Sequence, residues 1–191
     1  MEVIMKEIQR AVLLFIVLSV LTGVFYPMAV TVLAQAIFPQ QASGSLIYST
    51  DGKPAGSLLI GQPFSDPKYF WPRPSATAGS PYNPLASGGS NLGPTSKDLI
   101  NQISERTKSL KALEIHGLIP ADLVMASGSG LDPHISPEAA LMQIPRIARE
   151  RNMSEEKVHS LVQKSLEGRQ FGFLGEPRVN VLKLNLDLDK L

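Results

Sequence analysis

The chain contains no cysteine, and this absence excludes several classes of protein. A protein without cysteine has no disulfide scaffold, no cysteine-ligated zinc site and no iron–sulfur cluster. An excess of charge is also missing, because 18 Lys and Arg residues against 17 Asp and Glu residues leave a formal net charge of +1. The composition therefore shows no basic excess that would suggest nucleic-acid binding, and we expect no nucleic acid among the partners.

Catalytic signatures are scarce as well. The phosphate-loop pattern Gly-x-x-x-x-Gly-Lys-Ser/Thr does not occur in the sequence. Gly128-Ser129-Gly130 lacks the outer glycines of the hydrolase pattern Gly-x-Ser-x-Gly. The three histidines, His116, His134 and His159, follow no metal-ligand spacing. We therefore expect no catalytic residue, no metal site and no tightly bound cofactor in this chain.

Charged side chains are missing from Ala11 to Thr50, and residues 11–38 are almost wholly apolar. About 20 such residues suffice to cross a bilayer. We predict a transmembrane anchor at 11–38, with tilt or a bend at Pro27 taking up the excess length. Because the anchor holds no Asp, Glu, His, Lys or Arg side chain, it offers no ion pathway, and any transported ion must pass through another chain.

The start of the chain also resembles a secretory signal, since Ala34-Gln35-Ala36 is similar to a cleavage site. The apolar run is longer than the 7–15 residues of a cleavable signal, which favours a retained anchor over cleavage. Lys6 and Arg10 precede the span, whereas the first basic residue after it is Lys53. The positive-inside rule then predicts a cytoplasmic N-terminus, residues 1–10, and an extracytoplasmic domain, residues 39–191.

The part after the anchor has the length of one compact domain. We expect a single N-terminal transmembrane helix followed by one mixed α/β (α+β) soluble domain. Prolines and glycines concentrate at 62–94, which predicts an extended, irregular loop. Aromatic residues are rare in disordered linkers, so an ordered loop packed on the domain or on a partner is favoured. The aromatic residues of this loop are Phe64, Tyr69, Phe70, Trp71 and Tyr82.

Local patterns predict the elements of the domain. An Asp-Gly pair within Thr50–Pro54 indicates a hairpin of strands 45–49 and 57–60. Capping residues and apolar spacing predict helices over 95–115, from 136 to about 151, and from 154 to about 168. Short apolar and alternating runs predict strands at 121–126 and 182–189.

The segment from Ser127 to Pro137 is the most suggestive candidate site. A strand, the small-residue turn Ser127-Gly128-Ser129-Gly130 and a capped helix start are the parts of an anion-binding nest. The same residues also suit a tight connection in which Asp132 forms an Asx-turn and His134 fills the loop. A membrane-anchored extracytoplasmic hydrolase using Asp132 and His134, and a scaffold module without a site, are further alternatives.

Residues 126–139, ASGSGLDPHISPEA, resemble the signature of the C subunit of the Kdp-type potassium-transporting ATPase. Four further segments are similar to the same family: Phe70-Trp71-Pro72-Arg73-Pro74-Ser75, Tyr82-Asn83-Pro84, residues 87–92 and residues 178–182. With the apolar anchor, the resemblance covers about residues 10–188 in order.

This resemblance implies a non-catalytic accessory subunit of an ATP-driven, high-affinity potassium import complex in the cell membrane. It implies four partners: a potassium-conducting channel-like subunit, a P-type ATPase subunit, a small single-helix subunit and the lipid bilayer. In that family the C subunit is needed for assembly and is described as a catalytic chaperone that raises the ATPase subunit's affinity for ATP. ATP would then be a cofactor through the complex.

The resemblance also implies which residues make contacts. Nucleotide or partner contacts fall on Ser127, Gly128, Ser129, Gly130, Asp132 and His134, and partner contacts on Trp71, Arg73, Tyr82, Asn83 and Asn91. Because ATP is cytoplasmic while the charge pattern places the domain outside, the two expectations conflict if the loop touches nucleotide. We favour the outside placement, with these loops against the outer mouth of the potassium-conducting subunit.

Overall fold

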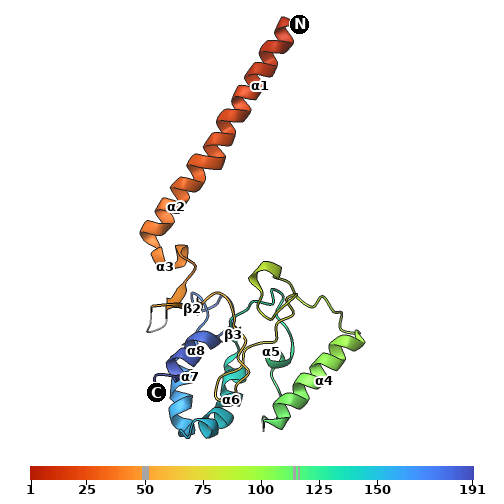
Figure 1. Cartoon of the computed structure of the whole chain (residues 1–191), viewed down its shortest axis with the longest axis vertical. Helices are drawn as coiled ribbons and strands as arrows, with labels where there is room; N and C mark the ends of the chain where they lie inside the picture. The colour runs from red at the N-terminus through yellow and green to blue at the C-terminus, as the bar shows by residue number, and fades with distance from the viewer. Residues whose placement is uncertain (49–51, 114, 116) are drawn as a thin grey trace. The chain divides into compact units, whose positions relative to one another are not determined.

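The computed structural model describes residues 1–48, 52–113, 115 and 117–191 (Figure 1). The chain divides into two compact units, Met1–Leu46 and Ile47–Leu191. The first is mainly a long apolar helix, and the second combines helices with small sheets. The expected class, one N-terminal helix followed by a mixed α/β domain, is confirmed.

The first unit is dominated by one continuous helix, and short α3 follows it. The helical segments are α1 (Glu2–Val20), the π-helical turn η1 (Leu21–Phe25), α2 (Tyr26–Ile37) and α3 (Pro39–Ala42). The π-helical turn lies just before Pro27, whose ring removes one backbone donor from the helix. Glu2–Ile37 spans 36 residues, and the mean hydropathy of an 18-residue stretch within it reaches 2.3. None of the described residues of this helix is buried. The helix is long and apolar enough to cross a membrane, which indicates membrane anchoring.

A two-stranded sheet follows the first unit. It pairs β1 (Leu46–Tyr48) with β2 (Pro54–Ser57), as the hairpin prediction requires. The second strand starts at Pro54, three positions earlier than expected, so its predicted bounds of 57–60 are wrong. The turn residues Thr50 and Asp51 lie outside the described residues.

A three-stranded antiparallel sheet forms the centre of the second unit, in the order β3-β5-β4. Its strands are β3 (His134–Ile135), β4 (Leu166–Glu167) and β5 (Arg178–Asn180). Val179 of β5 is fully buried and lies opposite both Ile135 and Leu166. Around it the helices α6 (Pro137–Glu150), α7 (Glu155–Lys164) and α8 (Val181–Leu188) enclose the core. Buried core residues of these helices include Ala139, Ile144, Ile147, Val158, Val162, Leu184 and Leu188.

Two of the predicted helices begin as their capping residues indicate. Ser136 accepts a hydrogen bond from the Ala139 amide at 3.1 Å, and Ser154 accepts one from the Lys157 amide at 3.3 Å. Helix α6 continues through Pro145 to Glu150. Helix α7 ends at Lys164 rather than near 168, because the chain turns into β4.

The strand predicted at 121–126 is wrong. Residues Ala121–Val124 form the short helix α5, which follows Pro120, and Met125 is extended. Leu123 and Val124 of this helix are buried. Such a short apolar run has no periodicity that separates a strand from a buried helical turn. The longer helix α4 (Lys97–Ala112) lies within the predicted range 95–115.

The strand predicted at 182–189 is also wrong, because Val181–Leu188 form helix α8. Asn180 caps this helix by accepting from the Lys183 amide at 3.1 Å. The residues at helical spacing on its inner face, Val181, Leu184, Asn185 and Leu188, are all buried. The alternation of leucines conceals this stripe, because a strand would place Leu184 and Asn185 on opposite faces.

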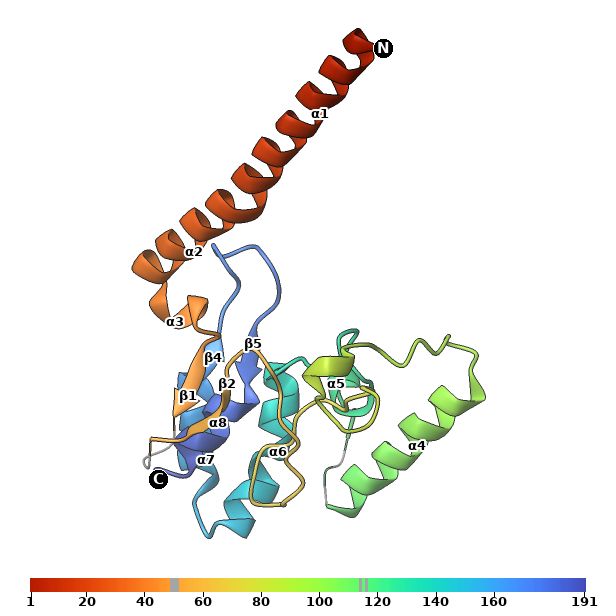
Figure 2. The same cartoon turned by 45° about the horizontal axis from the view of Figure 1, so that its top comes forward.

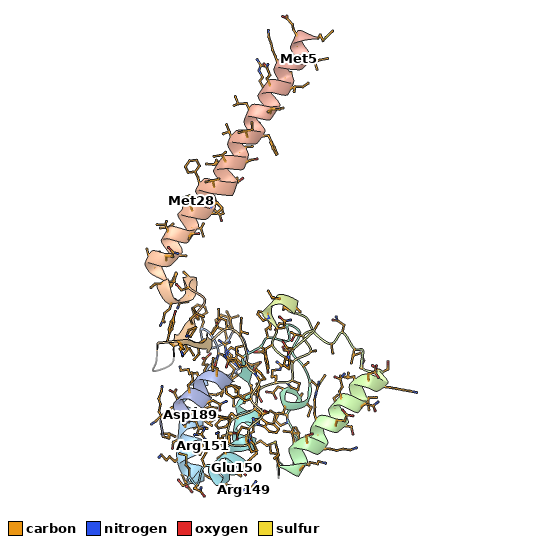
Figure 3. The ribbon with its side chains drawn as sticks, viewed as in Figure 1. Met5, Met28, Arg149, Glu150, Arg151 and Asp189 are labelled. Carbon is orange, nitrogen blue, oxygen red and sulfur yellow. The ribbon has the colours of Figure 1, made fainter. Side chains whose placement is uncertain are left out.

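The Pro/Gly-rich loop 62–94 packs on the domain. Its Phe70 is fully buried and its Tyr82 is 7% exposed. Polar side chains of α6 pair with its backbone: Gln143 Oε1 accepts from the Trp71 amide at 2.7 Å, and Arg146 Nη2 donates to the Tyr69 carbonyl at 3.0 Å. At the ends of α6 and α8, Arg151 and Asp189 form an ion pair at 2.6 Å (Figure 3). The loop therefore has a defined path without belonging to a sheet.

Candidate functional site

The segment Ser127–Gly130 is attached to the Pro/Gly-rich loop through its carbonyl groups. The Ser129 carbonyl accepts from the Gly88 amide at 2.8 Å and from Ser87 Oγ at 3.1 Å. The Gly130 carbonyl accepts from Ser75 Oγ at 2.7 Å. Two segments singled out in the sequence, 127–130 and 87–92, are thus brought together across about 40 positions of chain.

The two glycines of this segment have opposite environments. Gly130 is buried at φ +68°, and a Cβ atom there would lie 2.6 Å from Thr77 Cγ2 and 2.7 Å from the Gly88 carbonyl. Gly128 is exposed, and a Cβ atom built on it meets nothing within 4 Å. Gly130 therefore closes the contact between the loops, whereas Gly128 and the exposed Ser129 form an outward edge.

The geometry of this segment departs from an anion-binding nest. The expected preceding strand is helix α5, so the strand–turn–helix arrangement is absent from these described residues. The Gly130 amide donates to the Ser127 carbonyl at 3.3 Å, and the Leu131 amide donates to Ser129 Oγ at 3.1 Å. Both amides are already paired within the loop, which leaves the tight-connection interpretation better supported.

Asp132 is the centre of a small polar network. Its Oδ1 accepts from the His134 amide at 3.0 Å, which is the expected Asx-turn, and lies 3.3 Å from His134 Nδ1. Its Oδ2 accepts from Arg73 Nη1 at 2.9 Å. Burial by itself would raise the pKa of Asp132, but the hydrogen bonds from His134 and Arg73 outweigh it and hold that pKa below its ordinary value. Asp132 is therefore a charged anchor that joins the two loops.

Tyr82 supports the same network from inside. Its hydroxyl donates to the Arg73 carbonyl, and its amide donates to Ser75 Oγ at 2.9 Å. Burial raises the pKa of this hydroxyl well above its ordinary value, so the ring remains neutral. The ring also occupies the space where a side chain at Gly61 would lie. Tyr82 thus acts as a core residue of the loop and not as an exposed contact.

The other loop residues expected to meet a partner are dispersed. Trp71 is half-buried, with the Arg146 guanidinium 5.0 Å from its ring centroid. Asn83 caps the short 3₁₀ turn η2 (Pro84–Ala86), accepting from the Leu85 amide at 3.0 Å. Asn91 is exposed and has φ +52°. Of the five residues, Trp71, Tyr82 and Asn83 hold the loop together, Arg73 pairs with Asp132, and Asn91 faces outward.

A cleft of about 440 Å³ opens beside Asp132 and His134. Its described lining residues are Arg73, Asp122, Asp132, His134, Ile135, Ser136, Glu176, Pro177 and Arg178. Residues 127–130 are not among them, so the structure separates the exposed Gly128–Ser129 edge from the polar cleft.

Sequence reasoning missed three charged residues of this cleft. Asp122 Oδ2 accepts from the Ser136 amide at 2.6 Å, and Arg178 pairs with Glu167 at 3.1 Å. Glu176 also lines the cleft. Arg178 belongs to segment 178–182, which resembles the family. No local sequence pattern marks Asp122 or Glu176 as a site residue, because only the fold brings them to the cleft.

The cleft does not contain the serine–histidine pair of a serine hydrolase. Of its described lining residues, Ser136 alone carries a hydroxyl. That hydroxyl caps α6 and interacts with Asp122 Oδ1 at 3.2 Å instead of His134. Among the residues that the structure describes, no group of three or more His, Cys, Asp or Glu residues could hold a metal ion. The arrangement is that of an ion-paired structural junction with an exposed rim.

Comparisons with known proteins bear on the whole chain. Residues 8–190 match the family described as KdpC, the K+-transporting ATPase c chain. A protein of Geotalea uraniireducens (strain Rf4), named potassium-transporting ATPase KdpC subunit, is 59% identical over 187 residues, which cover 98% of this chain and 99% of that protein. Proteins of the same name from Geobacter sulfurreducens and Methylococcus capsulatus are 58% and 57% identical, over 98% and 97% of this chain and 99% and 98% of their own lengths.

Proposed function

Because this chain belongs to the KdpC family of K+-transporting ATPase c chains, we propose that it is a non-catalytic accessory subunit of an ATP-driven, high-affinity potassium import complex. The observation that carries this proposal is the similarity over nearly the full length to proteins named as subunits of a potassium-transporting ATPase. The apolar helix Glu2–Ile37 supports a place in the membrane beside larger subunits. The ion-paired junction around Asp132 supports a role in assembly over one in chemistry.

We place the domain outside the cytoplasm. Residues 1–10 carry Lys6 and Arg10 and stay on the cytoplasmic side, residues 11–38 cross the cell membrane once, and residues 39–191 lie beyond it. The helix itself carries no Asp, Glu, His, Lys or Arg from residue 11 onward, so the ion passes through a potassium-conducting, channel-like subunit. A P-type ATPase subunit and a small single-helix subunit complete the complex.

The contact with the potassium-conducting subunit falls on the outward edge of the two joined loops. Gly128 and Ser129 are exposed there, and Asn91 is exposed in the segment that leaves the same loop. Behind this edge, the Arg73–Asp132 ion pair and the buried Gly130 hold the backbone in place. An ordered edge of small residues allows a partner surface to approach the backbone closely.

The effect on ATP is indirect in this arrangement. A domain outside the membrane cannot touch cytoplasmic nucleotide, so Ser127–Gly130 is a partner contact and not a nucleotide contact. A chaperone role that raises the ATP affinity of the ATPase subunit then acts through the complex, as a coupling between two separate sites. Reciprocity follows: nucleotide bound to the ATPase subunit should tighten attachment of this chain.

Co-purification with a matched pair of variants tests the proposal. We expect Gly128→Val to lower recovery of the potassium-conducting and ATPase subunits with a tagged chain, without changing the unfolding midpoint of the domain. Leu85→Ala, at a side chain 95% exposed on η2, is the control and should recover both subunits normally. Absence of both larger subunits from the purified native chain would refute the accessory role. Normal recovery with Gly128→Val would refute the assigned contact edge.

A further inference from the structure

An exposed aromatic tip joins β4 to β5. We name residues 169–176 the aromatic hairpin; its ribbon projects beyond the two strands (Figure 2). Phe171 is 87% exposed, Phe173 is 71% exposed, and Leu174 is about half exposed. Single exposed apolar residues are common on proteins, but three within four positions of one tip form a patch that marks a surface to be covered.

The backbone at Phe171 is unusual for an aromatic residue. Phe171 has φ +52° and Gly172 has φ +82°, and the Phe173 amide donates to the Gln170 carbonyl at 3.2 Å. Two left-handed residues at the centre of such a turn are normally Asn, Asp or Gly. A bulky side chain there is disfavoured, and this ring is also exposed, so the folded domain gains nothing from it. A disfavoured conformation that displays an apolar ring points to a function outside the domain.

Part of the hairpin's backbone is hydrogen-bonded within the hairpin. The amides of Gln170 and Leu174 each donate to the other residue's carbonyl at 2.9 Å, and the Gly172 amide donates to the Arg169 carbonyl at 3.2 Å. Arg169 and Glu176 pair with each other at the base, and no charged residue lies between them. The tip is therefore apolar and partly hydrogen-bonded within itself, which lowers the number of backbone groups that need a partner where water is scarce.

The N-terminal helix keeps the domain close to a lipid bilayer. Its apolar helix ends at Ile37 and its second unit begins at Ile47, so nine residues, 38–46, separate them. Fully extended, nine residues reach about 30 Å, so the domain cannot leave the neighbourhood of the bilayer. A second attachment on the same chain then becomes an intramolecular event at high effective concentration.

We propose that the aromatic hairpin inserts Phe171 and Phe173 into the interfacial region of the bilayer that holds the N-terminal helix. Apolar side chains of surface-bound segments lie about 5–10 Å into the boundary between headgroups and acyl chains. Together, the helix and the hairpin attach the chain to lipid at two points. This restricts how the domain can rotate before it meets a partner subunit.

The absence of cysteine makes a direct test possible. A nitroxide attached to Phe171→Cys, in the full-length chain reconstituted in vesicles of equal parts phosphatidylethanolamine and phosphatidylglycerol, reports collisions with oxygen and with a water-soluble nickel chelate. We expect loss of nickel collisions together with a rise in oxygen collisions, because oxygen concentrates in lipid. Leu118→Cys, at a side chain 96% exposed elsewhere on the domain, is the matched control and should remain fully accessible to nickel. Phe173→Cys provides a second site should the first variant misfold.

Equal nickel accessibility at 171, 173 and 118 would overturn the proposal. Exclusion of nickel without a rise in oxygen collisions would indicate cover by protein, and would also overturn it. The measurement uses the chain without other subunits, so its failure is distinguishable from a failure of the assembly proposal, which co-purification tests.

Discussion

Asn185 pairs with both backbone groups of Phe70, which lies 115 positions away. Asn185 Oδ1 accepts from the Phe70 amide at 2.8 Å, and Asn185 Nδ2 donates to the Phe70 carbonyl at 2.9 Å. One side chain on α8 thereby replaces the two hydrogen bonds that a neighbouring strand would provide. Gln143 on α6 forms the same pair of hydrogen bonds with Trp71: it accepts from the Trp71 amide and donates to the Trp71 carbonyl. A loop rich in proline is thus ordered by side-chain amides.

We predict that Asn185→Leu lowers the free energy of unfolding by about 2–4 kcal/mol, because it leaves a buried N–H and a buried carbonyl unpaired. Urea unfolding of the chain in detergent measures this. The fluorescence of Trp71, the only tryptophan and the neighbour of Phe70, reports the transition.

Asn101→Leu is the matched control for this variant. Asn101 is an exposed residue on α4, and its replacement should change the free energy of unfolding by less than about 0.5 kcal/mol. Equal effects of the two substitutions would contradict the assigned role of Asn185.

The two glycines of the 127–130 segment provide a second prediction. Gly130→Ala should destabilise the domain by about 2–4 kcal/mol, because the added methyl group meets Thr77 and the Gly88 carbonyl at a left-handed φ. Gly128→Ala should have little effect on stability, because its Cβ points into open space. Thermal unfolding of the pair side by side distinguishes them. Similar unfolding temperatures for both variants would mean that the loops are not joined at Gly130.

The polar junction predicts a specific acid sensitivity. The folded-state pKa of Asp132 lies below its ordinary value of 3.8, so its contribution to stability is present above that pH and is lost as the pH falls through the folded pKa. Asp132→Asn should remove this part of the acid destabilisation below about pH 4. Arg73→Gln should make the loss of stability that Asp132 causes in acid smaller, because it removes one of the hydrogen bonds that lower the pKa of Asp132.

Urea midpoints measured stepwise from neutral to acidic pH test this prediction. The native chain should lose stability more steeply than Asp132→Asn below about pH 4. Superimposable pH profiles for the native chain and Asp132→Asn would show that the carboxylate is not held by its partners.

Elements with strong local chemistry were predictable from the sequence. The apolar run gives the N-terminal helix, and the Ser136 and Ser154 caps give the starts of α6 and α7. The strands expected at 121–126 and 182–189 are helices instead. Their short runs fit either period, and burial of Asn185 against Phe70, a long-range contact, decides the second case in favour of a helix.

The candidate site was predictable only in its local part. The turn between Asp132 and His134 follows from residues two positions apart. The pairing of Asp132 with Arg73, by contrast, spans 59 positions and depends on how the Pro/Gly-rich loop crosses the domain. Tyr82, which we expected at a partner contact, has a buried ring. The sequence does not distinguish the two cases, because an aromatic residue in a loop can pack into the domain's own core or against a partner.

The most direct test of the account is the side of the membrane on which the domain lies. Single cysteines at Leu85 and Leu118, 95% and 96% exposed, and at Glu2 in the N-terminal segment can be labelled in the assembled complex with a membrane-impermeant maleimide. In intact, right-side-out vesicles we expect Leu85→Cys and Leu118→Cys to react, and Glu2→Cys to react only after permeabilisation. Labelling of Glu2→Cys in intact vesicles, with both domain sites protected until permeabilisation, would contradict an accessory subunit that acts from outside the cell.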